Sequence, residues 1–254
     1  SKNLLYFGVG TQKVQAILEE TFPEASIERL DMDTTISGTN ITKILTAFNS
    51  GQIDILLGTQ MIAKGLDFPN ATLVGIINAD TGLFLPDFRS GEKVFQLIYQ
   101  AAGRAGRGSV PGEVVVQTYN SDNEIINDAV NFDMVGYYEK CLAERSDLNY
   151  PPFSWLVKLE IRGKNKRHVS HAIETLNNNI PSLPTGIEKL GPSPCYREKL
   201  KDQYRMQIVL KSNKKHDSSG ARVHHIYKHA INKSQLMKNT SSKIIVDVNP
   251  ISLL

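Results

Sequence analysis

Cysteine is scarce in this sequence, and long apolar runs are absent. The two cysteines, Cys141 and Cys195, form no cluster of metal ligands, so we expect no metal site within the chain. No apolar run reaches the length of a membrane span, and the N-terminus has no signal-peptide pattern. We therefore expect a soluble, cytoplasmic protein that does not contact a membrane. The sequence also lacks an initiator methionine, as expected for a fragment of a longer chain.

Charge is distributed unevenly along the 254 residues. Residues 1–150 contain 11 Lys and Arg against 19 Asp and Glu, a net charge of −8. Residues 151–254 contain 18 against 7, a net charge of +11, and all six histidines. This charge split predicts two domains. We place them at 1–148 and 149–254, because the pattern of apolar residues changes near Tyr150-Pro151-Pro152. The second domain either faces a polyanion or presents a basic, solvated surface.

Strands and helices alternate in the first part of the chain. Short apolar runs predict strands at 3–8, 26–32, 53–59, 72–78 and 113–119, and helical patterns lie at 11–22, 41–51 and 92–105. This alternation predicts an α/β fold with a mostly parallel sheet covered on both faces. Ligand sites in such sheets lie beyond the carboxyl ends of the strands. The residues at or just past those ends are Gly8, Gly10, Gly58, Thr59 and Asp80.

The second part predicts a smaller α+β domain of the order βαββαβ, the ferredoxin-like or split-βαβ arrangement. Strands are expected at 155–161, 186–190, 204–210 and 243–248, with helices at 169–176 and 223–230. The helices should cover one face of the sheet and leave the other face open and polar. That polar face carries Lys158, Glu160, Arg162, Arg205, Gln207 and Lys211. It has no aromatic pair, which argues against a base-stacking RNA-recognition sheet.

A glycine-rich helix end, "YQAAGRAGRG" at 99–108, carries two arginines. Each interior glycine costs roughly 1 kcal/mol relative to alanine, so this composition opposes helix propensity. A helical wheel separates an apolar stripe from a second group, which comprises Gln100, Gly103, Arg104 and Arg107. Guanidinium groups suit phosphate oxygens, and a converging pair suits the charge that develops during phosphoryl transfer. The alternative is two surface arginines on a frayed helix end.

Four other features leave alternatives open. Thr59 either contacts phosphate or lies in a simple strand-end turn, and "FGVGT" at 7–11 is either a phosphate-facing helix start or a tight turn. The long loop 79–91 either contacts nucleic acid or another domain, or packs Phe84 and Phe88 onto the core. His224, His225 and His229 lie at helical spacing without a matching carboxylate or cysteine, which favours a basic solvated face over a metal site.

Several segments carry a family resemblance. "QAAGRAGR" at 100–107 matches the Q-x-x-G-R-x-G-R motif of superfamily 2 helicases, and "ILLGTQMIAKGLDFPNATLVGIINAD" at 55–80 is similar to their motif V region. The segment 85–120 and the ending "IIVDVNPISLL" resemble the bacterial primosomal replication-restart helicases of the PriA family. The resemblance covers nearly the whole chain and is strongest over 51–120. It implies a RecA-like second helicase lobe followed by the C-terminal domain of that family.

The resemblance implies roles for residues that match the family motifs. Arg104 and Arg107 would be the arginine fingers, and Gln100 would lie beside the γ-phosphate of ATP. Gly65 and Asp67 match a segment that reaches the ribose, with Leu66 where histidine is expected in much of the family. The expected DNA contacts in the lobe are Gly10, Thr11, Gly58, Thr59 and Gln60. Those in the basic domain, which we infer from charge alone, are Lys158, Arg162 and Lys166.

The sequence contains no G-x-x-x-x-G-K-[ST] phosphate loop and no D-E-x-[HD] metal motif. At most half of an ATPase site is therefore present, and we expect this fragment alone to be inactive. The resemblance implies that an upstream lobe binds most of ATP and Mg²⁺, and that zinc belongs only to a cysteine-rich region upstream of Ser1.

The sequence thus predicts the C-terminal half of a bacterial ATP-dependent 3′-to-5′ DNA helicase that acts at stalled forks in replication restart and primosome assembly. Forked and single-stranded DNA are the expected substrates, and single-strand DNA-binding protein and other primosome proteins are the expected partners. The alternative is a non-catalytic module whose basic domain recognises branched DNA or docks other restart proteins.

Overall fold

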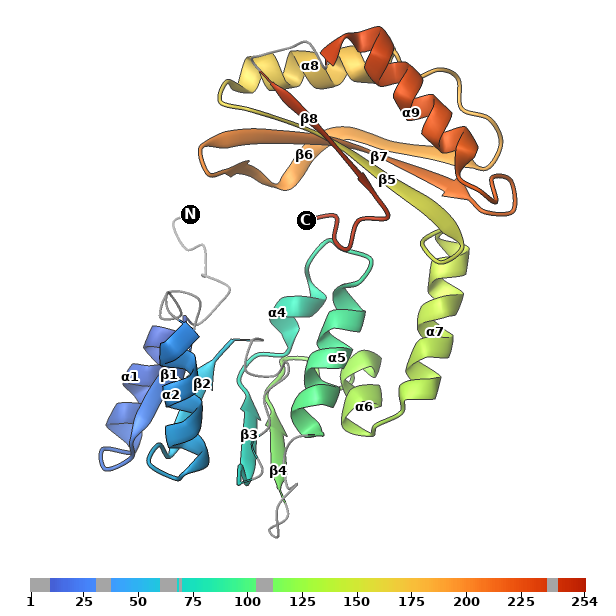
Figure 1. Ribbon diagram of the computed structural model, residues 1–254. Helices are drawn as coiled ribbons and strands as arrows, with labels where there is room; N and C mark the ends of the chain where they lie inside the picture. Colours follow the sequence, from blue (N-terminus) through green and yellow to red (C-terminus); the bar gives the residue numbers. More distant parts are fainter. Residues whose placement is uncertain (1–9, 31–37, 60–67, 69, 104–111, 237–241) are drawn as a thin grey trace. The chain divides into compact units, whose positions relative to one another are not determined.

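The computed structural model describes residues 10–30, 38–59, 68, 70–103, 112–236 and 242–254 (Figure 1). The chain forms two compact units. The first comprises Ser1–Leu85 and Ser90–Tyr137, and the second comprises Pro86–Arg89 and Tyr138–Leu254. The second unit therefore contains the whole range 149–254 and some residues upstream of it. In the described part of the chain, no helix is long and apolar enough to span a membrane.

The first unit has the predicted alternation of helices and parallel strands. α1 (Thr11–Thr21) is followed by β1 (Ile27–Leu30), and α2 (Gly38–Asn49) by β2 (Ile55–Gly58). β1 and β2 pair in parallel, and β3 (Leu73–Ile76) pairs in parallel with β4 (Glu113–Val116). The later helices of this unit are α4 (Asp80–Leu83), α5 (Ser90–Ala102) and α6 (Glu124–Val130), and α7 (Met134–Asp147) has its first residues in this unit and the rest in the second. The RecA-like α/β class is confirmed.

The core of the first unit is centred on α5. The predicted apolar stripe is buried at Val94, Ile98 and Ala101, and Phe95 joins it. The ring of Phe95 stacks on that of Tyr137, with centroids 4.0 Å apart and 7° between the planes. Burial of this one side fixes the rotation of α5 about its axis and leaves Gln100 on a different side.

The second unit is built on a four-stranded antiparallel sheet in the order β6-β7-β5-β8. In chain order these strands are β5 (Ser154–Gly163), β6 (Ile187–Leu200), β7 (Gln203–Asn213) and β8 (Lys243–Val248). α8 (Lys166–Asn178) follows β5, and α9 (Ala221–Ser234) follows β7. Both helices lie on the same face of the sheet (Figure 1). The order βαββαβ with this strand arrangement confirms the predicted ferredoxin-like domain.

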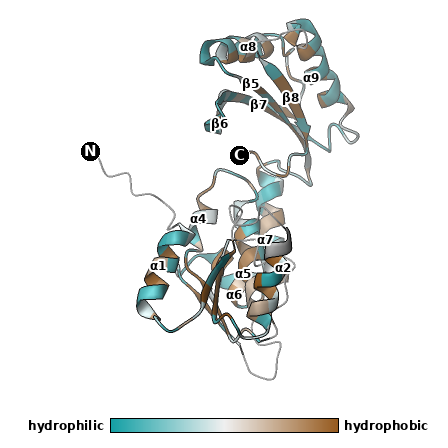
Figure 2. Ribbon diagram, turned by 60° about the vertical axis from the view of Figure 1, so that its left-hand side comes forward, coloured by the Kyte–Doolittle hydropathy of each residue, from teal (hydrophilic) through white to brown (hydrophobic). Residues whose placement is uncertain are grey.

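Alternating hydrophobic residues build the core between the sheet and the two helices. Val157, Leu159 and Ile161 of β5 contribute alternate positions, which face the apolar stripes of α8 and α9. α8 contributes Val169 and Ile173, among others, and both are fully buried. Figure 2 shows the corresponding alternation of hydrophobic and hydrophilic residues along the two helices.

β6 extends well beyond the strand predicted at 186–190. Pairing with β7 continues to Leu200, with register shifts between Leu190 and Ser193 and between Pro194 and Lys199. Gly191 permits the first shift because it has a φ of +92°, and a Cβ there would lie 2.8 Å from the Gln207 carbonyl oxygen. β6 is an edge strand, where proline is tolerated.

The polar face of the sheet is not open, so that prediction was wrong. Lys158, Glu160, Arg205 and Lys211 are all buried, each less than a tenth exposed. The Lys158 ammonium donates to the backbone oxygens of Leu253 and Leu254, and the Lys211 ammonium donates to the carbonyl oxygen of Leu148. Segments before β5 and after β8 therefore cover a face that alternation alone marked as solvated.

Candidate nucleic-acid interface and nucleotide-facing helix

The carboxyl ends of the parallel strands β1 and β2 lie at one edge of the first unit. Leu30 and Gly58 are register partners at this edge, and Gly58 and Thr59 are both exposed. A hydroxyl and backbone N–H groups at a strand end suit a phosphate oxygen. Gln60, the third predicted contact of this segment, lies outside the described residues.

The N-terminus of α1 lies at the same edge, because a helix that leads into a parallel strand runs antiparallel to it. Gly10 is the N-cap, with a φ of −60° and no side chain to block approach. A Cβ at this position would meet no atom within 4 Å. The predicted phosphate contacts Gly10 and Thr11 are thus brought to the same edge as Gly58 and Thr59.

Gln100 lies near the end of α5, is partly exposed, and lies off the buried stripe. The Gly103 N–H donates to the Tyr99 carbonyl oxygen at 3.0 Å, which closes the last turn beside Gln100. The other members of the predicted nucleotide site are Arg104, Arg107, Gly65 and Asp67, and they lie outside the described residues. The structure therefore places one of the five residues assigned to catalysis or ATP binding.

Asp80, which follows a strand end, is a buried hydrogen-bonding residue in the structure. It is 4 % exposed, and its carboxylate accepts from the Thr118 hydroxyl at 2.8 Å and the Tyr119 N–H at 2.9 Å. These bonds join the first residue of α4 to the segment that follows β4. Asp80 is therefore a structural residue of the strand edge.

The segment 79–91, which was predicted as one long loop, contains the short helix α4 and the start of α5, and its two phenylalanines differ in exposure. Phe84 is 72 % exposed, whereas Phe88 stacks on Tyr150 with centroids 4.8 Å apart and planes at 3°. The Arg145 guanidinium lies 5.3 Å from the centroid of the Phe88 ring. Pro86–Arg89 belongs to the second unit. The packing alternative thus holds for Phe88, and Phe84 remains available for contact.

Basic side chains gather at one end of the second unit, which we call the basic end: Arg162, Lys164, Lys166, Arg167, Lys199 and Lys201. Arg162 lies at the end of β5 and Lys166 at the start of α8, and the turn after β6 reaches the same end. Lys166 is 62 % exposed and forms an ion pair with Glu198 at 2.6 Å, which raises the pKa of its ammonium. Arg162 is 35 % exposed and pairs with Glu160. The basic end keeps two of the three predicted contacts on accessible positions.

Lys158, the third predicted contact, is not available to DNA. Its side chain is 6 % exposed and lies 3.4 Å from Glu160, within a buried ionic cluster that also contains Arg205. Arg205 donates to both Glu160 oxygens, at 2.7 and 3.0 Å. The sequence did contain a signal for this cluster, because side chains of opposite charge alternate with apolar residues on two strands that pair with each other.

Two groups at this face of the sheet, Glu160 within the ionic cluster and the buried Cys195, have pKa values shifted from their ordinary values. Burial by itself would raise the pKa of Glu160, but hydrogen bonds from Arg205 and Arg162 and the charges of Arg205 and Lys158 lower it to about 2. Burial raises the pKa of Cys195 to about 11, so its thiol stays protonated at neutral pH. Among the described residues, no group of three His, Cys, Asp or Glu side chains is arranged to hold a metal ion.

Comparison with known proteins supplies the family. Residues 1–109 match the helicase conserved C-terminal domain, and residues 146–251 match the primosomal protein N (PriA) C-terminal domain. The chain is 38 % identical over 257 residues to the replication restart protein PriA of Bacillus subtilis, covering 100 % of this chain and 31 % of that protein. The chain belongs to the PriA family and corresponds to its C-terminal region.

Other PriA proteins are similar to this chain over comparable lengths. The Treponema pallidum protein is 41 % identical over 213 residues, which cover 82 % of this chain and 32 % of that protein. The Haemophilus influenzae protein is 32 % identical over 251 residues, which cover 98 % of this chain and 34 % of that protein. The chain thus spans about a third of the length of the PriA proteins it matches, and the resemblance read from its motifs is confirmed.

Proposed function

We propose that this chain is the C-terminal part of an ATP-dependent 3′-to-5′ DNA helicase that acts at stalled forks in replication restart and primosome assembly. The observation that carries the proposal is the succession, in one chain, of a helicase C-terminal domain and a PriA C-terminal domain. The α/β lobe and the ferredoxin-like domain of the structure correspond to these two matches.

In this proposal the end of α5 faces ATP. Gln100 would lie beside the γ-phosphate, Arg104 and Arg107 would stabilise the developing charge, and Gly65 and Asp67 would reach the ribose. The partial exposure of Gln100, on a side of α5 away from the core, fits that role. ATP and Mg²⁺ would be held mainly by an upstream lobe, because this chain has no phosphate loop. Zinc would likewise belong only to the upstream region.

DNA would be contacted at two places. In the first unit, the edge with Gly10, Thr11, Gly58 and Thr59 offers hydroxyl and N–H groups to the backbone of the tracked strand. In the second unit, the basic end offers Arg162 and Lys166 to phosphates. Forked and single-stranded DNA would be the substrates. Single-strand DNA-binding protein and other primosome proteins would be partners.

A second candidate function is a non-catalytic module that recognises branched DNA or docks restart proteins. The net charge of +11 on residues 151–254, beside −8 on residues 1–150, favours a polyanion partner whether or not ATP is hydrolysed. In that case the first unit would serve as a platform.

A strand-displacement assay with the complete protein separates the two functions. Labelled duplexes with either a 3′ or a 5′ single-stranded overhang are incubated with ATP and Mg²⁺. The helicase proposal predicts ATP-dependent displacement from the 3′-overhang substrate. Tight fork binding without any displacement would favour the module instead, and displacement from the 5′ overhang alone would contradict the proposed polarity.

A further inference from the structure

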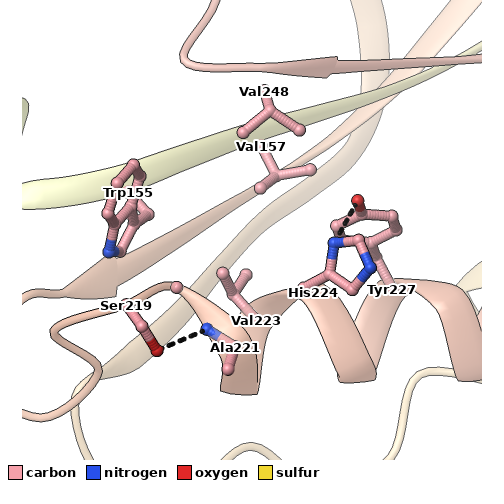
Figure 3. Close-up of a pocket in the computed structure, with 9 residues that line it drawn as sticks. Trp155, Val157, Ser219, Ala221, Val223, His224, Tyr227 and Val248 are labelled. Carbon is pink, nitrogen blue, oxygen red and sulfur yellow. Dashed lines mark hydrogen bonds between the residues drawn. The ribbon is translucent and has the colours of Figure 1, made fainter.

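The second unit has a pocket of about 210 Å³ on the helix side of its sheet, at the end of β5 opposite to the basic end. It opens between the start of β5, the end of β8 and the first turns of α9. Figure 3 shows Trp155 at one side of the pocket and His224 with Tyr227 at the other, with valines between them. Pockets for drug-sized ligands are larger, about 300–1,000 Å³, so this space suits a single ring system.

The pocket is apolar because its inner wall is part of the core. Val157, Val223 and Tyr227 are at most 6 % exposed and belong to the core cluster. Val248, on the edge strand β8, is 49 % exposed and forms the outer wall. The pocket is therefore accessible from solvent at Val248.

Trp155 is held as a rigid wall. Its indole N–H donates to the Asp217 carbonyl oxygen at 3.0 Å. Gly220 packs against the ring, since a Cβ there would lie 3.2 Å from the ring carbons Cδ2 and Cε2, and its φ of +74° also favours glycine. A preorganised aromatic ring loses little entropy on binding, which favours recognition of a flat partner.

The start of α9 is not an anion site. The carboxylate of Asp217 accepts from the backbone N–H groups of Arg222 and Val223, at 3.1 and 3.0 Å, and from the Ser212 hydroxyl. The interior of the pocket therefore suits an uncharged group. Polar contact is offered by the pair of His224 Nδ1 and the Tyr227 hydroxyl, 2.8 Å apart.

The rim of the pocket is cationic. The Lys214 ammonium lies 4.5 Å from the centroid of the Trp155 ring, and Arg222 and Lys228 are exposed next to pocket-lining residues of α9. Two carboxylates are close in sequence to pocket-lining residues, and the first, Asp217, is buried and hydrogen-bonded. Asp247 alternates with Val248 on β8 and so faces the opposite side of the sheet.

We propose that this pocket binds one unstacked nucleobase of single-stranded DNA, with the adjoining phosphates against Lys214 and Arg222. A nucleobase is a flat, uncharged ring system with hydrogen-bonding edges, attached to anions, and it matches the apolar interior, the aromatic wall and the cationic rim together. The inference rests on the proposed DNA binding of the second unit and adds to it a site at the opposite end of β5 from the basic end.

The test uses the 254-residue chain and two probes of equal charge and length: an oligomer of eight thymidylates and an eight-unit abasic oligomer. Trp155 is the only tryptophan, so quenching of its fluorescence reports on the pocket directly. We expect the thymidylate oligomer to bind about tenfold more tightly than the abasic oligomer, within the range for contact with one base, and to quench Trp155.

A matched pair of variants isolates the pocket. Val248→Phe fills it without changing charge, and Val246→Phe makes the same change on the same face of β8 outside the pocket, at a residue 37 % exposed. Val248→Phe should abolish the preference for thymidylates and keep the affinity for the abasic oligomer, while Val246→Phe should keep both.

Three outcomes would overturn the inference, and they are distinguishable. Equal binding of both oligomers without quenching would show that the chain binds DNA but that the pocket does not bind a base. If neither oligomer binds at low salt, the proposed DNA binding of the second unit is contradicted as well. Quenching by a peptide of alternating Asp and Phe, but not by thymidylates, would assign the pocket to a protein partner.

Discussion

Replacement of Glu160 by glutamine should strongly destabilise the second unit. Glu160 is 3 % exposed and is the carboxylate that faces the buried cations Lys158 and Arg205. Glutamine keeps the shape and removes the charge, which leaves buried cations uncompensated. Removing one partner of a buried ion pair typically costs about 3–5 kcal/mol.

The pKa of Glu160 gives a second estimate of this cost. It is lowered from 4.5 to about 2 in the folded protein. At about 1.36 kcal/mol per pKa unit, this difference is worth roughly 3 kcal/mol of stability at neutral pH. Because the folded pKa is the lower one, that stability is present above pH 4.5 and is lost as the pH falls from about 4.5 to about 2. Glu160→Gln should remove this part of the acid dependence.

Urea unfolding followed by the fluorescence of Trp155 measures the effect, because the only tryptophan lies in the second unit. With a slope of about 2 kcal/mol/M, the midpoint should fall by roughly 1.5–2.5 M. Glu188→Gln is the matched control, since Glu188 is 56 % exposed and pairs with Lys211, and its cost should stay below about 1 kcal/mol. A Glu160→Gln midpoint as close to wild type as that of the control would refute the reasoning.

Three further predictions follow from particular features of the chain. The 254-residue chain should hydrolyse no ATP with or without DNA, because it has no phosphate loop, and steady turnover by pure protein would contradict this. Its affinity for duplex DNA should fall as the salt concentration rises, with a log–log slope near −3 to −4 for roughly three to five phosphate contacts. The double variant Arg162→Glu with Lys166→Glu should flatten that slope in a titration at several salt concentrations. An unchanged slope would exclude the basic end as a DNA-binding surface. Phe88→Ala should lower the stability reported by Trp155 by about 2 kcal/mol through loss of the Tyr150 stack, whereas Phe84→Ala at a site 72 % exposed should change it by less than about 0.5 kcal/mol.

Periodicity in the sequence was sufficient to predict the elements of the ferredoxin-like domain and their order, whereas α4, α6 and α7 were not predicted. The two-residue alternation in β5 and β7 and the helical stripes of α8 and α9 each reflect one buried face, so the order βαββαβ could be read directly. Alternation marks a polar face but does not say what covers it. Lys211 is covered by Leu148, 63 residues away in sequence, and Lys158 by Leu253 and Leu254, 95 and 96 residues away.

Sites assembled from separate segments were harder to predict than motifs. Gln100 and the strand-end residues Gly58 and Thr59 lie in short motifs, so their sequence positions alone indicated a role. The pocket combines Trp155, Gly220 and Val248 from three segments, and nothing in any one segment marks it. Asp217 did leave a signal, because an aspartate shortly before the apolar stripe of α9 is typical of a helix start.

ATP turnover by the complete protein with Arg104→Ala or Arg107→Ala tests the central claim most directly. If the end of α5 carries the arginine fingers of a helicase, each substitution should lower DNA-stimulated turnover by about 10³-fold or more. DNA affinity measured without nucleotide should change little, which separates loss of catalysis from loss of folding. Near-normal turnover in both variants would contradict the assignment of this helix end to the ATP site.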